Sequence, residues 1–178
     1  MRTLTDSTLN KNVPQRLRTP GSITSAVSLV AFICLAGSAF AQGPSESEAF
    51  INSKDITWGA APPSMPEGAK LAVLHGDPGK SGPFVIRLMV PPGYNLPPHW
   101  HSQDESLTVI AGTLYFGPGD RVETTKAHTL TAGAFHFLSG KDHHYLVAKS
   151  QAIVQVNGNG PFDITYIDSH NDPQKPKD

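Results

Sequence analysis

From residue 70 onward, short runs of apolar and β-branched residues alternate with polar residues and turn signals. Gly, Pro, Asp or Asn stands at nearly every junction between runs, and no segment keeps a helical period of apolar residues. The runs are KLAVLHG, PFVIRLMV, ESLTVIAGTLYFG, HTLTAG, AFHFLSG, HHYLVA, AIVQVNG and FDITYI. Many short, evenly spaced strands predict an all-β domain, an antiparallel sandwich or barrel.

The regions on either side of these runs have a different composition. Residues 42–69 are rich in Pro, Ser, Gly and Ala. We interpret residues 42–55 as a flexible leader arm and residues 56–168 as a single domain, which opens with a short strand around Ile56–Trp58. The polar ending HNDPQKPKD predicts a frayed tail over residues 169–178.

The first 41 residues read as a secretory signal peptide. A basic stretch leads into an uncharged apolar run over residues 23–41, which ends Ala-Phe-Ala before Gln42. The alternative is a transmembrane anchor, because the run approaches the roughly 20 residues that a span needs. Gly37 and the small residues at the end favour cleavage after Ala41. We therefore expect a periplasmic or secreted protein with no membrane segment after cleavage.

Charge and cysteine content restrict the metal ligands and the partners that the protein can have. The only cysteine, Cys34, lies in the apolar run, so the chain after cleavage has no thiolate, and any metal must be held by nitrogen and oxygen. From residue 42 onward there are ten Lys and Arg against fourteen Asp and Glu, with no basic run. Nucleic acid is therefore not an expected partner, because phosphate binding needs clustered cations. The expected partner is a small molecule.

Two histidines and a glutamate in the stretch GYNLPPHWHSQDESLTVIAG are candidate metal ligands. In a strand, His99 and His101 point to the same face and Trp100 to the other, with the histidines about 7 Å apart along the chain. The two prolines before them place this strand at a rim. If the turn after His101 brings the chain back antiparallel, Glu105 comes beside both histidines. Such a set suits Fe, Mn, Ni, Zn or Cu, whereas the alternative is a chance pattern on a polar loop.

The glycines around this stretch carry a resemblance to a known family. Gly93, His99, His101, Glu105 and Gly112 match the first motif of the cupin superfamily at each fixed position. The chain resembles small, single-domain, exported bacterial cupins over roughly residues 56–167. The resemblance implies a double-stranded β-helix, which is a jelly-roll β-barrel, and it makes a homodimer the expected assembly.

The second cupin motif is degenerate in this chain. Counting from Gly133 places its histidine at His144, which completes a set of three histidines and one glutamate. Gly140 comes one place earlier than the motif requires, and a one-residue shift of the turn would put His143 in the ligand position instead. His144 keeps the register from Gly133 and is preferred. The supporting proline, glycine and asparagine positions hold Ser139, Lys141 and Ala148.

Four further residues are candidates for the pocket. Arg87 interrupts an apolar strand and would bind an anionic substrate if it faced inward, although an edge position facing water is the alternative. His136 and His143 lie near the second motif, where a solvated or hydrogen-bonded histidine is the plainer interpretation. Tyr145 is either a pocket phenol or a core residue.

A site of three histidines and one glutamate leaves coordination positions open, which is typical of catalytic or sensing metals. The resemblance therefore implies a divalent transition metal and two kinds of chemistry on a small oxygenated molecule. One is dioxygenase chemistry, and the other is isomerase or lyase chemistry by carbonyl polarisation. Glu105 is in addition a candidate base. The alternative function is a non-catalytic module that binds or senses a small ligand.

Overall fold

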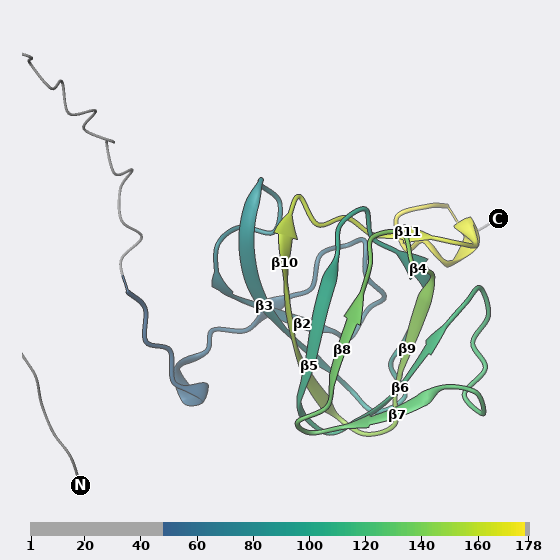
Figure 1. The fold of residues 1–178 in the computed structure, drawn as a ribbon, viewed down its shortest axis with the longest axis horizontal. Helices are drawn as coiled ribbons and strands as arrows, with labels where there is room; N and C mark the ends of the chain where they lie inside the picture. Colours follow the sequence, from purple (N-terminus) through teal and green to yellow (C-terminus); the bar gives the residue numbers. More distant parts are fainter. Residues whose placement is uncertain (1–47, 177–178) are drawn as a thin grey trace, which may run out of the picture. The chain divides into compact units, whose positions relative to one another are not determined.

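Two antiparallel sheets face each other in the computed structural model, which describes residues 48–176 (Figure 1). The larger sheet has, in spatial order, strands β1 (Gly59–Ala60), β2 (Lys70–His75), β3 (Gly82–Val90), β10 (Ala152–Gly160), β5 (Glu105–Ala111) and β8 (Phe135–Leu138). The smaller sheet has β11 (Thr165–Tyr166), β4 (Asn95–Trp100), β9 (His144–Ala148), β6 (Thr113–Pro118) and β7 (His128–Thr131). The predicted all-β jelly roll is confirmed.

The core lies between the two sheets and follows from strand alternation. In β5, Glu105, Leu107 and Val109 are buried while the residues between them are less so, and in β10 Val154 and Val156 show the same period of two. Apolar residues of the smaller sheet, such as Leu114 in β6, complete this core. One buried face on each sheet is what the alternating pattern predicts.

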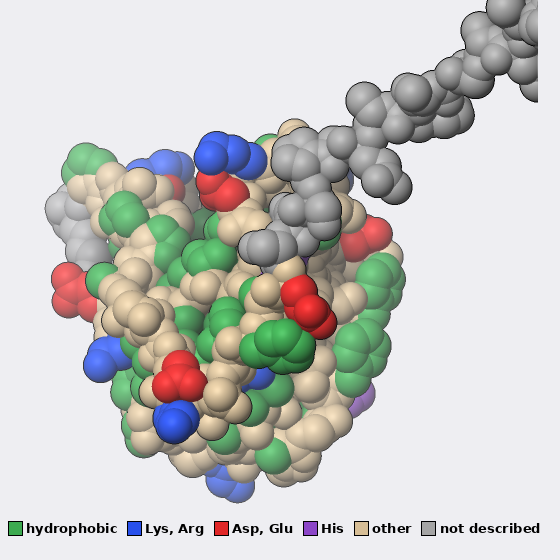
Figure 2. Space-filling view, turned by 90° about the vertical axis from the view of Figure 1, so that its left-hand side faces the viewer, with side chains coloured by type: hydrophobic (Ala, Val, Ile, Leu, Met, Phe, Trp, Pro, Cys, Tyr) green, Lys and Arg blue, Asp and Glu red, His purple; other side chains and the backbone are tan. Residues whose placement is uncertain are grey.

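The surface carries charges of both signs. Figure 2 shows one face of the molecule, on which hydrophobic side chains are spread among polar ones and the Lys and Arg side chains lie among Asp and Glu. Among the described residues, Lys80 pairs with Asp77 and Lys126 with Glu123 at the surface, and His143 and His170 contact Asp120 and Asp168. Such exposed pairs contribute little to stability.

The chain crosses from one sheet to the other within the opening motif. β4 pairs with β9 and β11, whereas β5 pairs with β10 and β8. The turn after His101 is therefore a crossover and not the antiparallel return that the sequence suggested. The prolines of β4 do not mark an outermost strand. They stand at a register shift against β9, between Leu96 and His99, where a missing N–H is tolerated.

The turn before β9 keeps its register through an unusual backbone conformation. Lys141, at the glycine position of the second motif, has a φ of 71° and is the only non-glycine residue with positive φ among residues 48–176. Its N–H donates to the carbonyl of His101 at 2.8 Å, and the N–H of Gly140 donates to Asp104 Oδ1 at 2.8 Å. The lysine thus takes the left-handed conformation of the missing glycine, and β9 begins at His144 without a shift.

Several predictions about the ends of the chain fall partly or wholly outside the described residues. The signal peptide, its cleavage after Ala41 and Cys34 all lie there. Within the described part, the strand expected around Ile56–Trp58 is instead β1, and the 3₁₀ helix η1 (Ser53–Asp55) precedes it. The tail starts with a second 3₁₀ helix, η2 (Ser169–Asn171), which the Asp168 side chain caps. No helix among residues 48–176 is long and apolar enough to cross a membrane.

Replacing Lys141 by glycine should raise stability by about 1 kcal/mol, because a non-glycine residue in the left-handed region costs roughly 1–2 kcal/mol and glycine's greater freedom in the unfolded chain offsets part of the gain. Urea unfolding measures this change. The neighbouring substitution Gly140→Ala is the matched control and should destabilise, since its Cβ would lie 2.8 Å from the carbonyl oxygen of Ser102. A Lys141→Gly protein less stable than wild type would contradict this account of the turn.

Candidate metal centre

Three buried histidines meet at one end of the barrel. His99 in β4 pairs directly with His144, the first residue of β9, and His101 follows one residue after β4 ends. The ring centroids of His99 and His144 lie 4.1 Å apart, and His101 lies 4.9 Å from His99 and 5.2 Å from His144. One ring nitrogen from each of the three lies within 4.8 Å of the others, so the cluster can hold a metal ion. Strand register and parity therefore bring these rings together.

Main-chain carbonyls fix the orientation of each ring. The Nδ1 atoms of His99, His101 and His144 lie 2.7, 2.5 and 3.0 Å from the carbonyl oxygens of Pro97, Asp163 and Asp142 respectively. A carbonyl oxygen only accepts hydrogen bonds, so Nδ1 carries the proton in each ring. Nε2 is left as the nitrogen available to a metal in all three, which is the usual arrangement of histidine ligands.

Glu105 reaches the same cluster from the other sheet. It opens β5, is 5% exposed, and places Oε2 3.4 Å from His101 Nε2 and 3.6 Å from His144 Nε2. Oε2 is buried and has no hydrogen-bond partner among the described residues. A buried carboxylate oxygen without a partner is costly, and a cation between it and the imidazoles would satisfy it. The residues present therefore fit a metal ion.

The electrostatics of the cluster favour a negative carboxylate and neutral rings at His99 and His144. Burial lowers the pKa of His99 well below its usual value, and the neighbouring His144 and His101 lower it further. Burial also lowers the pKa of His144. Burial alone would raise the pKa of Glu105, but the two adjacent histidines outweigh it and the pKa falls. Burial alone would lower the pKa of His101, but Glu105 and Asp163 together outweigh it and the pKa is raised. Nitrogen and carboxylate donors of this kind suit first-row divalent metals.

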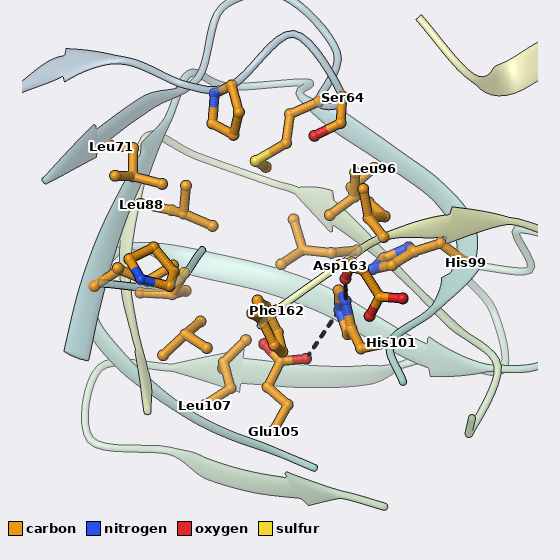
Figure 3. A pocket seen from close by; sticks show the side chains of 18 of the residues that line it. Ser64, Leu71, Leu88, Leu96, His99, His101, Glu105, Leu107, Phe162 and Asp163 are labelled. Atoms are coloured by element: carbon orange, nitrogen blue, oxygen red, sulfur yellow. Dashed lines mark hydrogen bonds and ion pairs between the residues drawn. The ribbon is translucent and has the colours of Figure 1, made fainter. Parts of the chain in front are cut away.

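A cavity of about 490 Å³ extends from this cluster into the barrel. His99, His101 and Glu105 lie at one end, and Leu71 and Leu88 lie across the cavity from the two histidines (Figure 3). Its size is typical of small-molecule sites. Apart from the cluster, most of the wall is apolar and is formed by Pro62, Met65, Leu71, Pro78, Ile86, Leu88, Leu96, Leu107, Phe116, Leu146, Val154, Val156, Phe162 and Ile164.

Two residues that the sequence did not single out support His101. The ring of Phe162 stacks on the His101 ring with centroids 4.2 Å apart and planes 23° apart. Asp163 accepts the His101 Nδ1–H at its carbonyl, and its carboxylate accepts hydrogen bonds from the N–H and hydroxyl of Ser102 at 2.7 and 2.8 Å. The run FDITYI suggested only a strand, and that strand is confined to Thr165–Tyr166.

The structure does not place Arg87 or His136 among the residues that line the cavity. Arg87 Nε donates to Gln155 Oε1 at 3.1 Å, while its neighbours on either side, Ile86 and Leu88, line the cavity from the opposite face of β3. The His136 ring lies 4.7 Å from that of Phe116, which lines the cavity. His136 is paired with Leu107 across β5 and β8, so it lies beside wall residues without itself lining the cavity.

His143 and Tyr145 point away from the cluster on either side of His144. His143 has an exposed side chain with Nδ1 2.6 Å from Asp120 Oδ1. The buried Tyr145 hydroxyl donates to the carbonyl of Glu123 at 2.9 Å and accepts from its N–H at 3.1 Å. Tyr145 therefore anchors the loop between β6 and β7, and His144 is the histidine of this segment that joins the cluster.

Comparisons with known proteins agree with this fold. A polyketide cyclase, RemF from Streptomyces resistomycificus, superposes with a TM-score of 0.59 at 17% identity, covering 74% of this chain and 96% of the cyclase. A putative acetylacetone dioxygenase from Methylibium petroleiphilum PM1 superposes with a TM-score of 0.57 at 16% identity, covering 73% and 88% of the two chains. An RmlC-like cupin from Shewanella frigidimarina gives a TM-score of 0.50 at 18% identity, covering 64% and 91%.

Sequence comparison identifies the family. No curated protein sequence matches the chain. A family described as a domain of unknown function, DUF4437, matches residues 45–165, a range that contains the three histidines and Glu105. The chain therefore belongs to the DUF4437 family, and its fold is that of the cupin superfamily.

Proposed function

We propose that this protein binds one divalent first-row transition metal through His99, His101, His144 and Glu105, and uses it in chemistry on a small organic molecule. The observation that carries the proposal is the orientation of the rings. All three Nδ1 atoms are held by main-chain carbonyls, so three Nε2 lone pairs and an unpartnered carboxylate oxygen share one buried space. A cluster that served only packing would have no need of this orientation.

The position of the cluster supports a catalytic metal and not a structural one. Four protein ligands at the end of a cavity leave further coordination positions directed at whatever fills that cavity. When bound, the metal would supply Lewis-acid polarisation of a substrate oxygen or, if redox-active, oxygen activation. In this set Glu105 is the candidate general base, because a carboxylate can accept a proton whereas imidazoles bound through Nε2 and protonated at Nδ1 cannot.

The names of two structural neighbours support the proposal of chemistry on a small oxygenated molecule. They are a polyketide cyclase and a putative acetylacetone dioxygenase, whose names point to small oxygenated organic molecules. For this chain we accordingly propose either dioxygenase chemistry or isomerase or lyase chemistry. Export after cleavage at Ala41 and assembly into a homodimer remain predictions from the sequence.

Metal analysis of two neighbouring variants tests the ligand assignment. The wild-type protein purified without added metal should contain about one equivalent of a transition metal, as expected for one site. His144→Ala should lose most of it, because one of three nitrogen donors is gone. His143→Ala should keep it, since that side chain is exposed and contacts Asp120.

Elemental analysis measures the metal content, and circular dichroism shows that each variant is folded. If His144→Ala retains the metal and His143→Ala loses it, His143 and not His144 is the ligand. An empty but folded wild-type protein would favour the non-catalytic binding module.

Glu105→Gln tests whether the carboxylate is a ligand. The substitution keeps the shape of the side chain and removes its charge, so the affinity for Zn²⁺ should fall at least about tenfold. Glu123→Gln is the matched control, because that carboxylate pairs with Lys126 at the surface and should leave affinity unchanged. Competition with a chromogenic chelator gives both affinities. Equal zinc affinities for Glu105→Gln and wild type would remove Glu105 from the ligand set.

A further inference from the structure

The ionisable side chains of the cavity gather at one end, opposite an apolar wall. The ionisable cluster occupies one end, where His99, His101 and Glu105 lie, and the opposite wall is formed by Leu71 and Leu88 (Figure 3). These two leucines are directly paired on neighbouring strands β2 and β3, so their side chains form one continuous surface. A ligand that fills the cavity must therefore present a polar end to the cluster and an apolar body to the leucines.

The charge of the lining argues against an anionic body. None of the described residues that line the cavity is Lys or Arg. The acidic residues in the lining are Glu105, in the cluster, and Asp163, whose carboxylate already accepts two hydrogen bonds from Ser102. Arg87, which lies between the wall residues Ile86 and Leu88, bonds Gln155 and does not line the cavity. A carboxylate or phosphate placed against the leucines would be desolvated without a partner, which is strongly unfavourable.

The same lining argues against a ligand rich in hydroxyl groups. Outside the cluster, the polar side chains in the lining are Ser64, Asp163 and Gln174, and the remainder of the wall is apolar or glycine. Most hydroxyls of a sugar-like ligand would lose their hydrogen bonds to water and find none in the cavity. The apolar wall instead favours hydrocarbon surface, and each buried methylene contributes about 0.8 kcal/mol.

We propose that the cavity takes a neutral ligand with an apolar, ring-sized or branched body and one oxygen-bearing end. The oxygen end lies at the histidine–glutamate cluster, and the body lies against Leu71 and Leu88. This substrate class rests on the proposed metal function for its polar end, whereas its apolar body rests on the wall alone.

Two probes with the same head and different tails test this selectivity. 1-Phenylbutane-1,3-dione has two oxygens that can chelate zinc and a neutral phenyl tail, and its 4-carboxyphenyl analogue carries a charge at the far end of that tail. Isothermal titration of the zinc-loaded protein should show the phenyl compound binding at least about tenfold more tightly than the carboxyphenyl compound. Comparable affinities, or tighter binding of the charged tail, would overturn the proposal.

Two lysine substitutions on strand β2 test whether the preference for the phenyl tail comes from the leucine wall. Leu71→Lys places a cation in the wall that is half-buried in the wild type, so the ratio of the two affinities should reverse in favour of the carboxyphenyl compound while the zinc content stays the same. Val73→Lys is the matched control, because Val73 lies on the same strand, is 48% exposed and does not line the cavity. An unchanged ratio in folded Leu71→Lys would show that the probes do not occupy this cavity.

Repeating the titrations on chelator-treated protein separates the two claims. If the wild-type protein takes up no zinc, the proposed metal function fails, but the preference for the phenyl tail should persist in weakened form because the wall is unchanged. If zinc binds and the tail preference is absent, the metal function stands and the substrate class is wrong.

Discussion

Three hydrogen bonds from imidazole Nδ1 to main-chain carbonyls are the constraint on which the rest of the site depends. The carbonyls belong to Pro97 in β4, Asp142 in the turn before β9 and Asp163 after β10, so three separate segments must be in place at once. Each bond fixes a tautomer and the direction of a ring. Without them the buried rings would rotate and their Nε2 atoms would not share one space, so the fold and the candidate chemistry are parts of one arrangement.

The jelly-roll topology places a carboxylate from one sheet beside imidazoles from the other. The chain leaves the smaller sheet after His101 and enters the larger one at Glu105, so the ligands of a single motif span the core. Burying a carboxylate and three imidazoles in an otherwise apolar barrel is unfavourable unless the charge of the carboxylate is balanced. Oε2 of Glu105 lies near Nε2 of His101 and His144 but has no hydrogen-bond partner among the described residues. A bound cation would supply this balance, and the low-dielectric surroundings would strengthen the interaction.

The periodicity of the sequence was sufficient for the class of fold and for several strands. KLAVLHG and PFVIRLMV became β2 and β3 because their alternation matches one buried face. The direction of Arg87 stayed open in the sequence, and the structure shows that its neighbours Ile86 and Leu88 line the cavity instead. The partner strands of β4 and β5 could not be predicted, because the sequence of the turn after His101 is compatible with both a hairpin and a crossover between sheets. Asp163 was missed for a different reason: it acts on His101 through its carbonyl, a group that every residue has. The backbone of Lys141, which replaces the expected glycine, likewise required coordinates.

The central claim is that the three Nε2 atoms and Glu105 surround one ion. The most direct measurement is an anomalous difference map from a crystal of the metal-loaded protein, recorded at the absorption edge of the bound metal. The account predicts one strong peak at about 2.0–2.2 Å from Nε2 of His99, His101 and His144 and within bonding distance of Glu105. A peak bound through Nδ1, a peak at His143, or no peak between the rings of a folded, metal-treated protein would contradict it.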